Sequence, residues 1–93
     1  MSEVAARYQV PAAVVREVLS EDELVALDSQ SHQFYSLNGT AKRVYELAAE
    51  WLAASVIAER LSAEFDVAPS ECQKDVTELL ADLEAYGLLT RSD

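Results

Sequence analysis

The stretch QFYSLNGTAKRVYELA, residues 33–48, changes its hydrophobic period halfway along, and this change constrains the fold more than any other feature of the sequence. Residues 34–37 alternate in the manner of a short β-strand. From Ala41 onward, apolar residues recur at steps of three and four, as they do on one face of a helix. Only the segment NGT separates the two patterns. The sequence therefore predicts an aromatic strand that runs directly into a capped helix.

Two further strands are predicted before this segment. Residues 14–19 are rich in β-branched residues and residues 23–27 form a second extended run, each followed by polar turn residues. Three consecutive strands with short connections favour an antiparallel meander. Residues 1–12 are expected to form an N-terminal arm, and residues 13–90 the folded domain.

Helices are expected after the meander. The first has an apolar stripe within residues 41–52, with Asn38 as its expected N-cap and Thr40 as the alternative. Its residue Trp51 is expected in the core, the alternative being a docking patch for an enzyme. The second helix is expected to be capped by Ser55 and to bury Phe65.

The third helix has the clearest boundary signals. Ser70 and Gln73 have the spacing of a capping box, and Gly87 is expected as the left-handed residue that ends the helix. Residues 66–69, which join it to the second helix, resemble the turn of a helix-turn-helix motif. The predicted fold class is α+β, a winged helix-turn-helix with a three-stranded antiparallel sheet followed by three helices.

The charge of the chain restricts its partners. The formal net charge is −10, and residues 44–93 hold eleven acids against three bases. Nucleic-acid affinity comes largely from lysine and arginine, so this acidity opposes contact with a phosphate backbone. No stretch approaches the roughly 18 apolar residues of a membrane span. Residues 1–7 lack a basic start followed by an apolar run, so no signal peptide is expected there. A cytoplasmic protein is expected, with no membrane or nucleic-acid partner.

The sequence offers little for catalysis. The single histidine, His32, lies in a polar turn, and the single cysteine, Cys72, lies on the apolar face of the third helix. Neither a metal-ligand pattern nor a glycine-rich phosphate loop is present. We therefore expect no enzyme, no catalytic residue, no metal site and no cofactor.

Binding is the remaining class of function, and the third strand is its first candidate. As the last strand of a meander, it has an open outer edge unless another segment covers it. Neither proline nor lysine blocks residues 33–37. An open edge of this kind favours pairing with a partner strand. Alternation assigns Tyr35 and Leu37 to the core and leaves Phe34 exposed.

The third helix is the second candidate. On a helical wheel its apolar line, formed by Cys72, Val76, Leu79 and Leu83, lies beside an acidic line formed by Glu71, Asp75, Glu78 and Asp82. The acidic line is either a solvated face or one wall of a peptide groove. Two other functions stay open: a winged-helix nucleic-acid-binding regulator, and a module that dimerises by pairing its own strand edge.

The ordered segments FYSLNGTA and DVTELLADLEAYGLL resemble the PqqD-like family over residues 14–90. The resemblance implies a non-catalytic recognition element that binds the leader of a ribosomally made precursor peptide as an added strand, beside the third strand and against the third helix. The segment LDSQSHQFYSLNGTA resembles stand-alone recognition proteins of lasso-peptide pathways. That likeness implies three partners, namely the precursor leader peptide, a leader peptidase and a macrolactam-forming cyclase. The candidate peptide-binding residues are Gln33, Phe34, Tyr35, Ser36, Leu37, Lys74, Asp75, Val76, Glu78, Leu79, Asp82, Leu83 and Tyr86.

Overall fold

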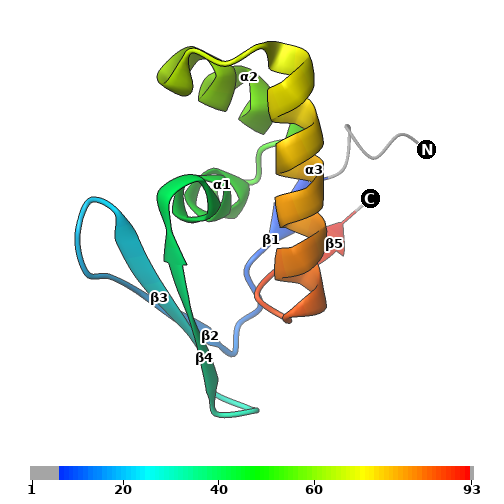
Figure 1. The fold of residues 1–93 in the computed structure, drawn as a ribbon. Helices are drawn as coiled ribbons and strands as arrows, with labels where there is room; N and C mark the ends of the chain where they lie inside the picture. The colour runs from blue at the N-terminus through cyan, green and yellow to red at the C-terminus, as the bar shows by residue number, and fades with distance from the viewer. Residues whose placement is uncertain (1–6, 93) are drawn as a thin grey trace.

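A computed structural model describes residues 7–92 of the chain and shows an α+β fold (Figure 1). Along the chain the elements are β1 (Arg7–Gln9), β2 (Val14–Val18), β3 (Glu23–Asp28), β4 (Gln33–Asn38), α1 (Gly39–Ala49), α2 (Ala54–Phe65), α3 (Pro69–Ala85) and β5 (Thr90–Ser92). The predicted fold class is confirmed, because β2, β3 and β4 form an antiparallel sheet and three helices follow it. None of the described helices is long and apolar enough to cross a bilayer.

The sheet buries one face against α1. Leu24, Ala26 and Leu37 point to this face and are buried, as are Val44 and Tyr45 of α1. Alternation along β4 is as predicted, since Leu37 is buried while Phe34 is 67% exposed. The chain passes from β4 directly into α1 where the hydrophobic period changes, and the buried residues of the sheet and of α1 form one core.

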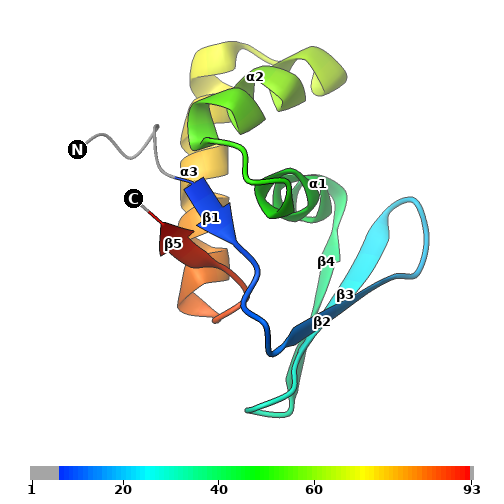
Figure 2. The same cartoon turned by 180° about the vertical axis from the view of Figure 1, so that it is seen from behind.

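The chain ends form a second, two-stranded sheet. Arg7–Gln9 pairs antiparallel with Thr90–Ser92, and the view from behind shows β1 and β5 side by side (Figure 2). Tyr8 is only 5% exposed. Residues 7–9 were expected to lie in an N-terminal arm outside the folded domain. They belong to the fold instead, because they pair with β5 and bury Tyr8. Residues 1–6 of that arm lie outside the described residues.

Gly87 ends α3 as predicted. Its φ is +79°, its N–H donates to the carbonyl of Glu84 at 3.0 Å, and the Leu88 N–H donates to the carbonyl of Leu83 at 3.0 Å. These two bonds define a Schellman motif. The motif turns the buried Leu88 into the core, where its carbonyl accepts a 3.0 Å hydrogen bond from the Tyr45 hydroxyl. Burial raises the pKa of Tyr45 to about 12, against a smaller lowering by the charge of Arg16.

The predicted side-chain caps of the second and third helices are wrong. Ala53 is the N-cap residue of α2 and Ala68 that of α3, so Ser55 and Ser70 lie inside the helices. The first turns are instead closed by backbone bonds, such as Ile57 N–H to the Ala53 carbonyl at 3.0 Å. The capping box with Gln73 is consequently not formed, since neither helix has a side-chain cap bond.

Asn38 occupies the predicted N-cap position of α1, but its side chain makes no cap hydrogen bond. The first helical amide, that of Gly39, donates to the carbonyl oxygen and to Oδ1 of Asp22, each at 3.2 Å. The turn between β2 and β3 therefore supplies the partner for the start of α1.

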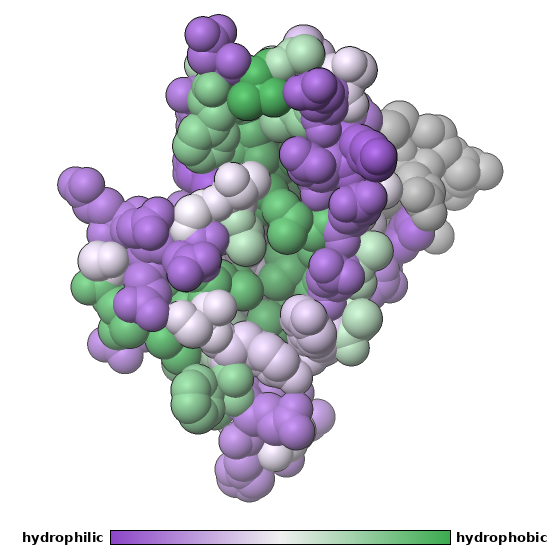
Figure 3. All heavy atoms as spheres, viewed as in Figure 1, coloured by the Kyte–Doolittle hydropathy of each residue, from purple (hydrophilic) through white to green (hydrophobic). Residues whose placement is uncertain are grey.

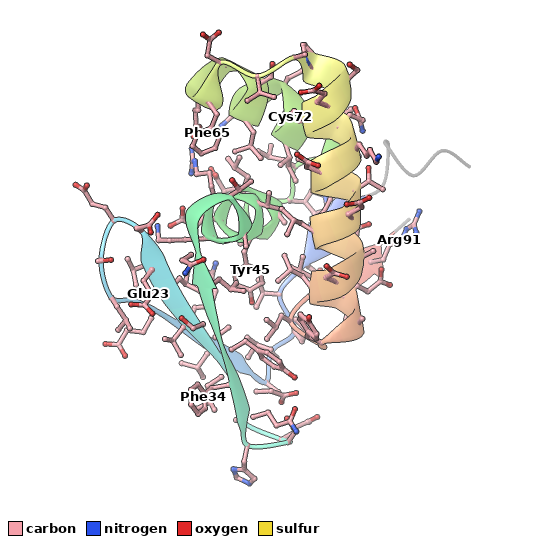
Figure 4. The ribbon with its side chains drawn as sticks, in the orientation of Figure 1. Glu23, Phe34, Tyr45, Phe65, Cys72 and Arg91 are labelled. Atoms are coloured by element: carbon pink, nitrogen blue, oxygen red, sulfur yellow. The ribbon has the colours of Figure 1, made fainter. Side chains whose placement is uncertain are left out.

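Two aromatic residues that were expected in the core are exposed. Trp51 is 45% exposed and follows the end of α1 with a φ of +67°, which turns the chain away from the helix axis. Phe65 is 49% exposed at the end of α2, just before Asp66 reverses the chain with a φ of +55° (Figure 4). Both positions lie where a helix pattern stops.

Candidate functional site

The outer edge of β4 is the first component of the candidate site. In the strand order β2-β3-β4, β4 is terminal, and within residues 7–92 its only strand partner is β3. The N-terminal strand β1 pairs with β5 in a separate sheet, and both views show this pair away from β4 (Figures 1 and 2). The sequence-based prediction of an edge strand is confirmed.

The backbone groups at this edge follow from the register. The Gly39 N–H donates to the Asp22 carbonyl, and pairing then alternates along the antiparallel ladder. Tyr35 and Leu37 therefore direct their backbone groups toward β3, whereas Phe34 and Ser36 direct theirs outward. On the other side of β3, the Leu19 N–H donates to the Glu23 carbonyl at 2.9 Å, which fits the same alternation. Within the predicted pairing segment 33–37, only Phe34 and Ser36 therefore offer both their N–H and their C=O groups to a partner strand.

The second component is a groove beside α3. A hollow of about 290 Å³ is lined by one residue of the first turn of α1 and four of α3, namely Thr40, Asp75, Glu78, Leu79 and Asp82. Figure 3 shows apolar surface between the hydrophilic outer side of α3 and the segment that leads from β4 into α1. Three residues of the acidic line, Asp75, Glu78 and Asp82, thus lie along the α3 side of this groove, whereas Glu71 does not line it.

An aromatic contact joins β4 to the end of α3. The Tyr35 and Tyr86 rings stack with their centroids 5.0 Å apart and their planes inclined by 17°. The Tyr35 hydroxyl donates to Gln33 Oε1 at 2.9 Å, which fixes the ring orientation. Tyr86 remains 50% exposed. The stack therefore joins β4 to the end of α3, four residues after Asp82, and leaves apolar ring surface of Tyr86 accessible there, although neither tyrosine lines the hollow itself.

Not all predicted site residues reach the groove. Val76 and Leu83 are 0% and 2% exposed, because their side of α3 packs against the rest of the core. The prediction that they form apolar pockets for a peptide is wrong for this structure. Lys74 is exposed on α3 but does not line the groove, while Leu79 is half-buried and does.

The reactive side chains of Cys72 and His32 do not line this groove. Cys72 is buried, and burial, followed by the charge of Asp75, raises the pKa of its thiol. His32 is exposed in the turn between β3 and β4, with a φ of +64°. Among the described residues, no group of three histidine, cysteine or acidic side chains is placed to hold a metal ion.

The fold and the site define a small winged-helix domain that leaves its last sheet strand open beside its third helix. The chain belongs to the PqqD family, because residues 23–89 match the profile of the family described as Coenzyme PQQ synthesis protein D (PqqD).

Two solved structures share this fold. TbiB1, in complex with the TbiA(beta) leader peptide, is 26% identical, with a TM-score of 0.80 over 87% of this chain and 93% of that one. Lasso peptide synthetase B1, complexed with the leader peptide, is 19% identical, with a TM-score of 0.81 over 90% of this chain and 98% of that one. No match is found among curated proteins.

Proposed function

We propose that this protein is a non-catalytic adaptor that binds the leader of a ribosomally made precursor peptide in the cytoplasm. The observation that carries the proposal is the open edge of β4 beside the groove of α3. It is supported by TbiB1, which shares the fold over most of both chains and is described in complex with a leader peptide.

The leader is proposed to add a strand to the sheet. Its backbone pairs with the outward N–H and C=O groups of Phe34 and Ser36, each hydrogen bond contributing about 0.5–1.5 kcal/mol. In strand addition, main-chain bonds supply affinity and side-chain pockets supply specificity. Leu79 and the exposed part of Tyr86 supply the apolar contacts here.

The charge of the groove predicts which leaders fit. Asp75, Glu78 and Asp82 are exposed along α3 and line the hollow. They favour a leader with lysine or arginine at positions that face α3, and they disfavour an acidic one. The same acids make α3 a poor recognition helix for DNA, whose phosphates need basic partners.

The adaptor is proposed to deliver the leader to modifying enzymes of a lasso-peptide type pathway, namely a leader peptidase and a cyclase. Holding the precursor beside an enzyme raises its effective concentration there, so delivery requires no chemistry from the adaptor itself.

Titration of a fluorescent leader peptide against Ser36→Pro and Ser36→Ala tests this function. Proline removes the outward N–H of Ser36 without touching the ladder to β3, and it is tolerated at sheet edges. Both variants lose the 2.8 Å hydrogen bond that Ser36 Oγ donates to Glu23. A difference in leader affinity between them therefore reports on the backbone N–H, which alanine keeps and proline lacks. We expect Ser36→Pro to weaken binding about tenfold or more and Ser36→Ala to bind as the unsubstituted protein does. Equal affinities for the two variants would contradict strand addition.

A further inference from the structure

The outer face of the sheet, opposite α1, carries an apolar patch. The strand register places Val15, Leu27 and Phe34 in one row across β2, β3 and β4, and Val25 lies in the next row. Val15 is 59% exposed, Leu27 39% and Phe34 67%. We call Val15, Val25, Leu27 and Phe34 the outer patch. With Arg16 and Glu17 they line a hollow of about 260 Å³.

An antiparallel sheet with one solvated face normally shows polar residues on that face. Here the core-facing side is covered by α1, and yet the other side also carries a row of exposed apolar residues. Figure 4 shows Phe34 on the side of β4 away from α3, so its ring does not enter the groove. Contiguous exposed apolar residues rimmed by polar ones are typical of interaction sites.

The charges around the patch restrict the occupant. Residues 14–38 contain five acids and one base. Glu17 and Glu23 lie on the same face as the patch by alternation, and the whole chain has a net charge of −10. A second copy of this chain would bring like charges together, which opposes association. A folded partner with an apolar surface bordered by lysine and arginine has the complementary charge.

We infer that the outer patch docks the precursor-modifying enzyme, through an apolar surface of that enzyme bordered by basic residues. The inference rests on the proposed adaptor function, which requires contact with such an enzyme. Phe34 connects the two surfaces: its side chain belongs to the outer patch, while its backbone faces the open edge. A leader paired with β4 would therefore lie directly beside the docked enzyme, and both could be bound at once.

Biolayer interferometry with the purified leader peptidase and, separately, the purified cyclase of the same pathway tests the inference. Val15→Asp and Leu27→Asp place a charge in the outer patch and leave the groove unchanged. We expect each to weaken binding of the enzyme about tenfold or more, as loss of a central apolar contact does, with the affinity for the leader unaltered. Val67→Asp is the matched control, because Val67 is 38% exposed but lies in the α2–α3 turn.

Three results would overturn the inference: neither enzyme binds the unsubstituted protein, the two patch variants bind as tightly as it does, or Val67→Asp loses the enzyme equally. A dimer in sedimentation equilibrium that Leu27→Asp converts to monomer would assign the patch to a second copy instead. Leader titration on the same samples separates the two proposals. Failure to bind the leader refutes the adaptor function, whereas intact leader binding with unchanged enzyme affinity in the patch variants refutes only the docking surface.

Discussion

The ring of Tyr35 in β4 stacks on the ring of Tyr86 at the end of α3, with 5.0 Å between their centroids. This contact links the open strand edge to the helix that forms the opposite wall of the groove. Stacked aromatic pairs contribute about 0.5–1.5 kcal/mol beyond the area they bury. The spacing between edge and helix, on which an added strand depends, is therefore held at this end by one pair of rings.

We predict that Tyr86→Ala weakens leader binding about tenfold, because the substitution removes both the stack and the exposed apolar ring surface at the end of α3. The affinity is measured by titration of a fluorescent leader peptide. Trp51→Ala is the control, since Trp51 is similarly exposed but lies after α1. If Tyr86→Ala binds the leader normally, the stack has no role in the groove.

Leu79→Asp is predicted to weaken leader binding about tenfold or more with little change in melting temperature. Leu79 is the apolar residue among those that line the groove, and it is only partly buried. Leu79→Met, which keeps the apolar character, is expected to retain affinity. An aspartate variant with undiminished affinity would show that the leader does not contact this part of α3.

Leu83→Ala is predicted to act on stability rather than on recognition. Leu83 is 2% exposed, and truncation of a buried leucine costs about 2–5 kcal/mol of unfolding free energy because it leaves a cavity. Urea denaturation measures this loss. Leader affinity at a temperature where the variant is fully folded is expected to stay within a few-fold of that of the unsubstituted protein. A stable variant with strongly reduced affinity would instead return Leu83 to the binding site.

Stability is predicted to fall between about pH 10 and 12 through Tyr45. Its pKa is raised from 10.0 to about 12 in the folded protein, so the folded state holds this proton more tightly than the unfolded state. The resulting stabilisation is complete below pH 10 and is lost as the pH rises toward 12. Unfolding free energies at pH 9 and 11 are expected to differ more for the unsubstituted protein than for Tyr45→Phe. Equal differences would mean that Tyr45 does not titrate with folding.

Local patterns in the sequence were sufficient to predict the three-stranded sheet, the order of the helices and the open edge of β4. The period change at residues 33–48 predicts β4 and α1, and Gly87 ends α3 because a left-handed residue is needed there. Alternation also placed Leu37 inside and Phe34 outside. These features depend on neighbours in sequence.

Features that depend on distant segments were missed. The pairing of Arg7–Gln9 with Thr90–Ser92 joins the two ends of the chain, and three-residue strands show no measurable period. The start of α1 uses Asp22, a partner from another turn, in place of a side-chain cap. In the site, helical spacing could not tell which residues of the apolar line of α3 pack inward, so Val76 and Leu83 were assigned to the groove.

Amide hydrogen exchange, observed by NMR with and without the leader peptide, tests strand addition most directly. In the free protein the amides of Phe34 and Ser36 are expected to exchange quickly, whereas those of Tyr35 and Leu37 are protected by their bonds to β3. Saturating leader peptide is predicted to slow exchange at Phe34 and Ser36 and to leave the other two unchanged. Fast exchange at Phe34 and Ser36 in the saturated complex would contradict the account.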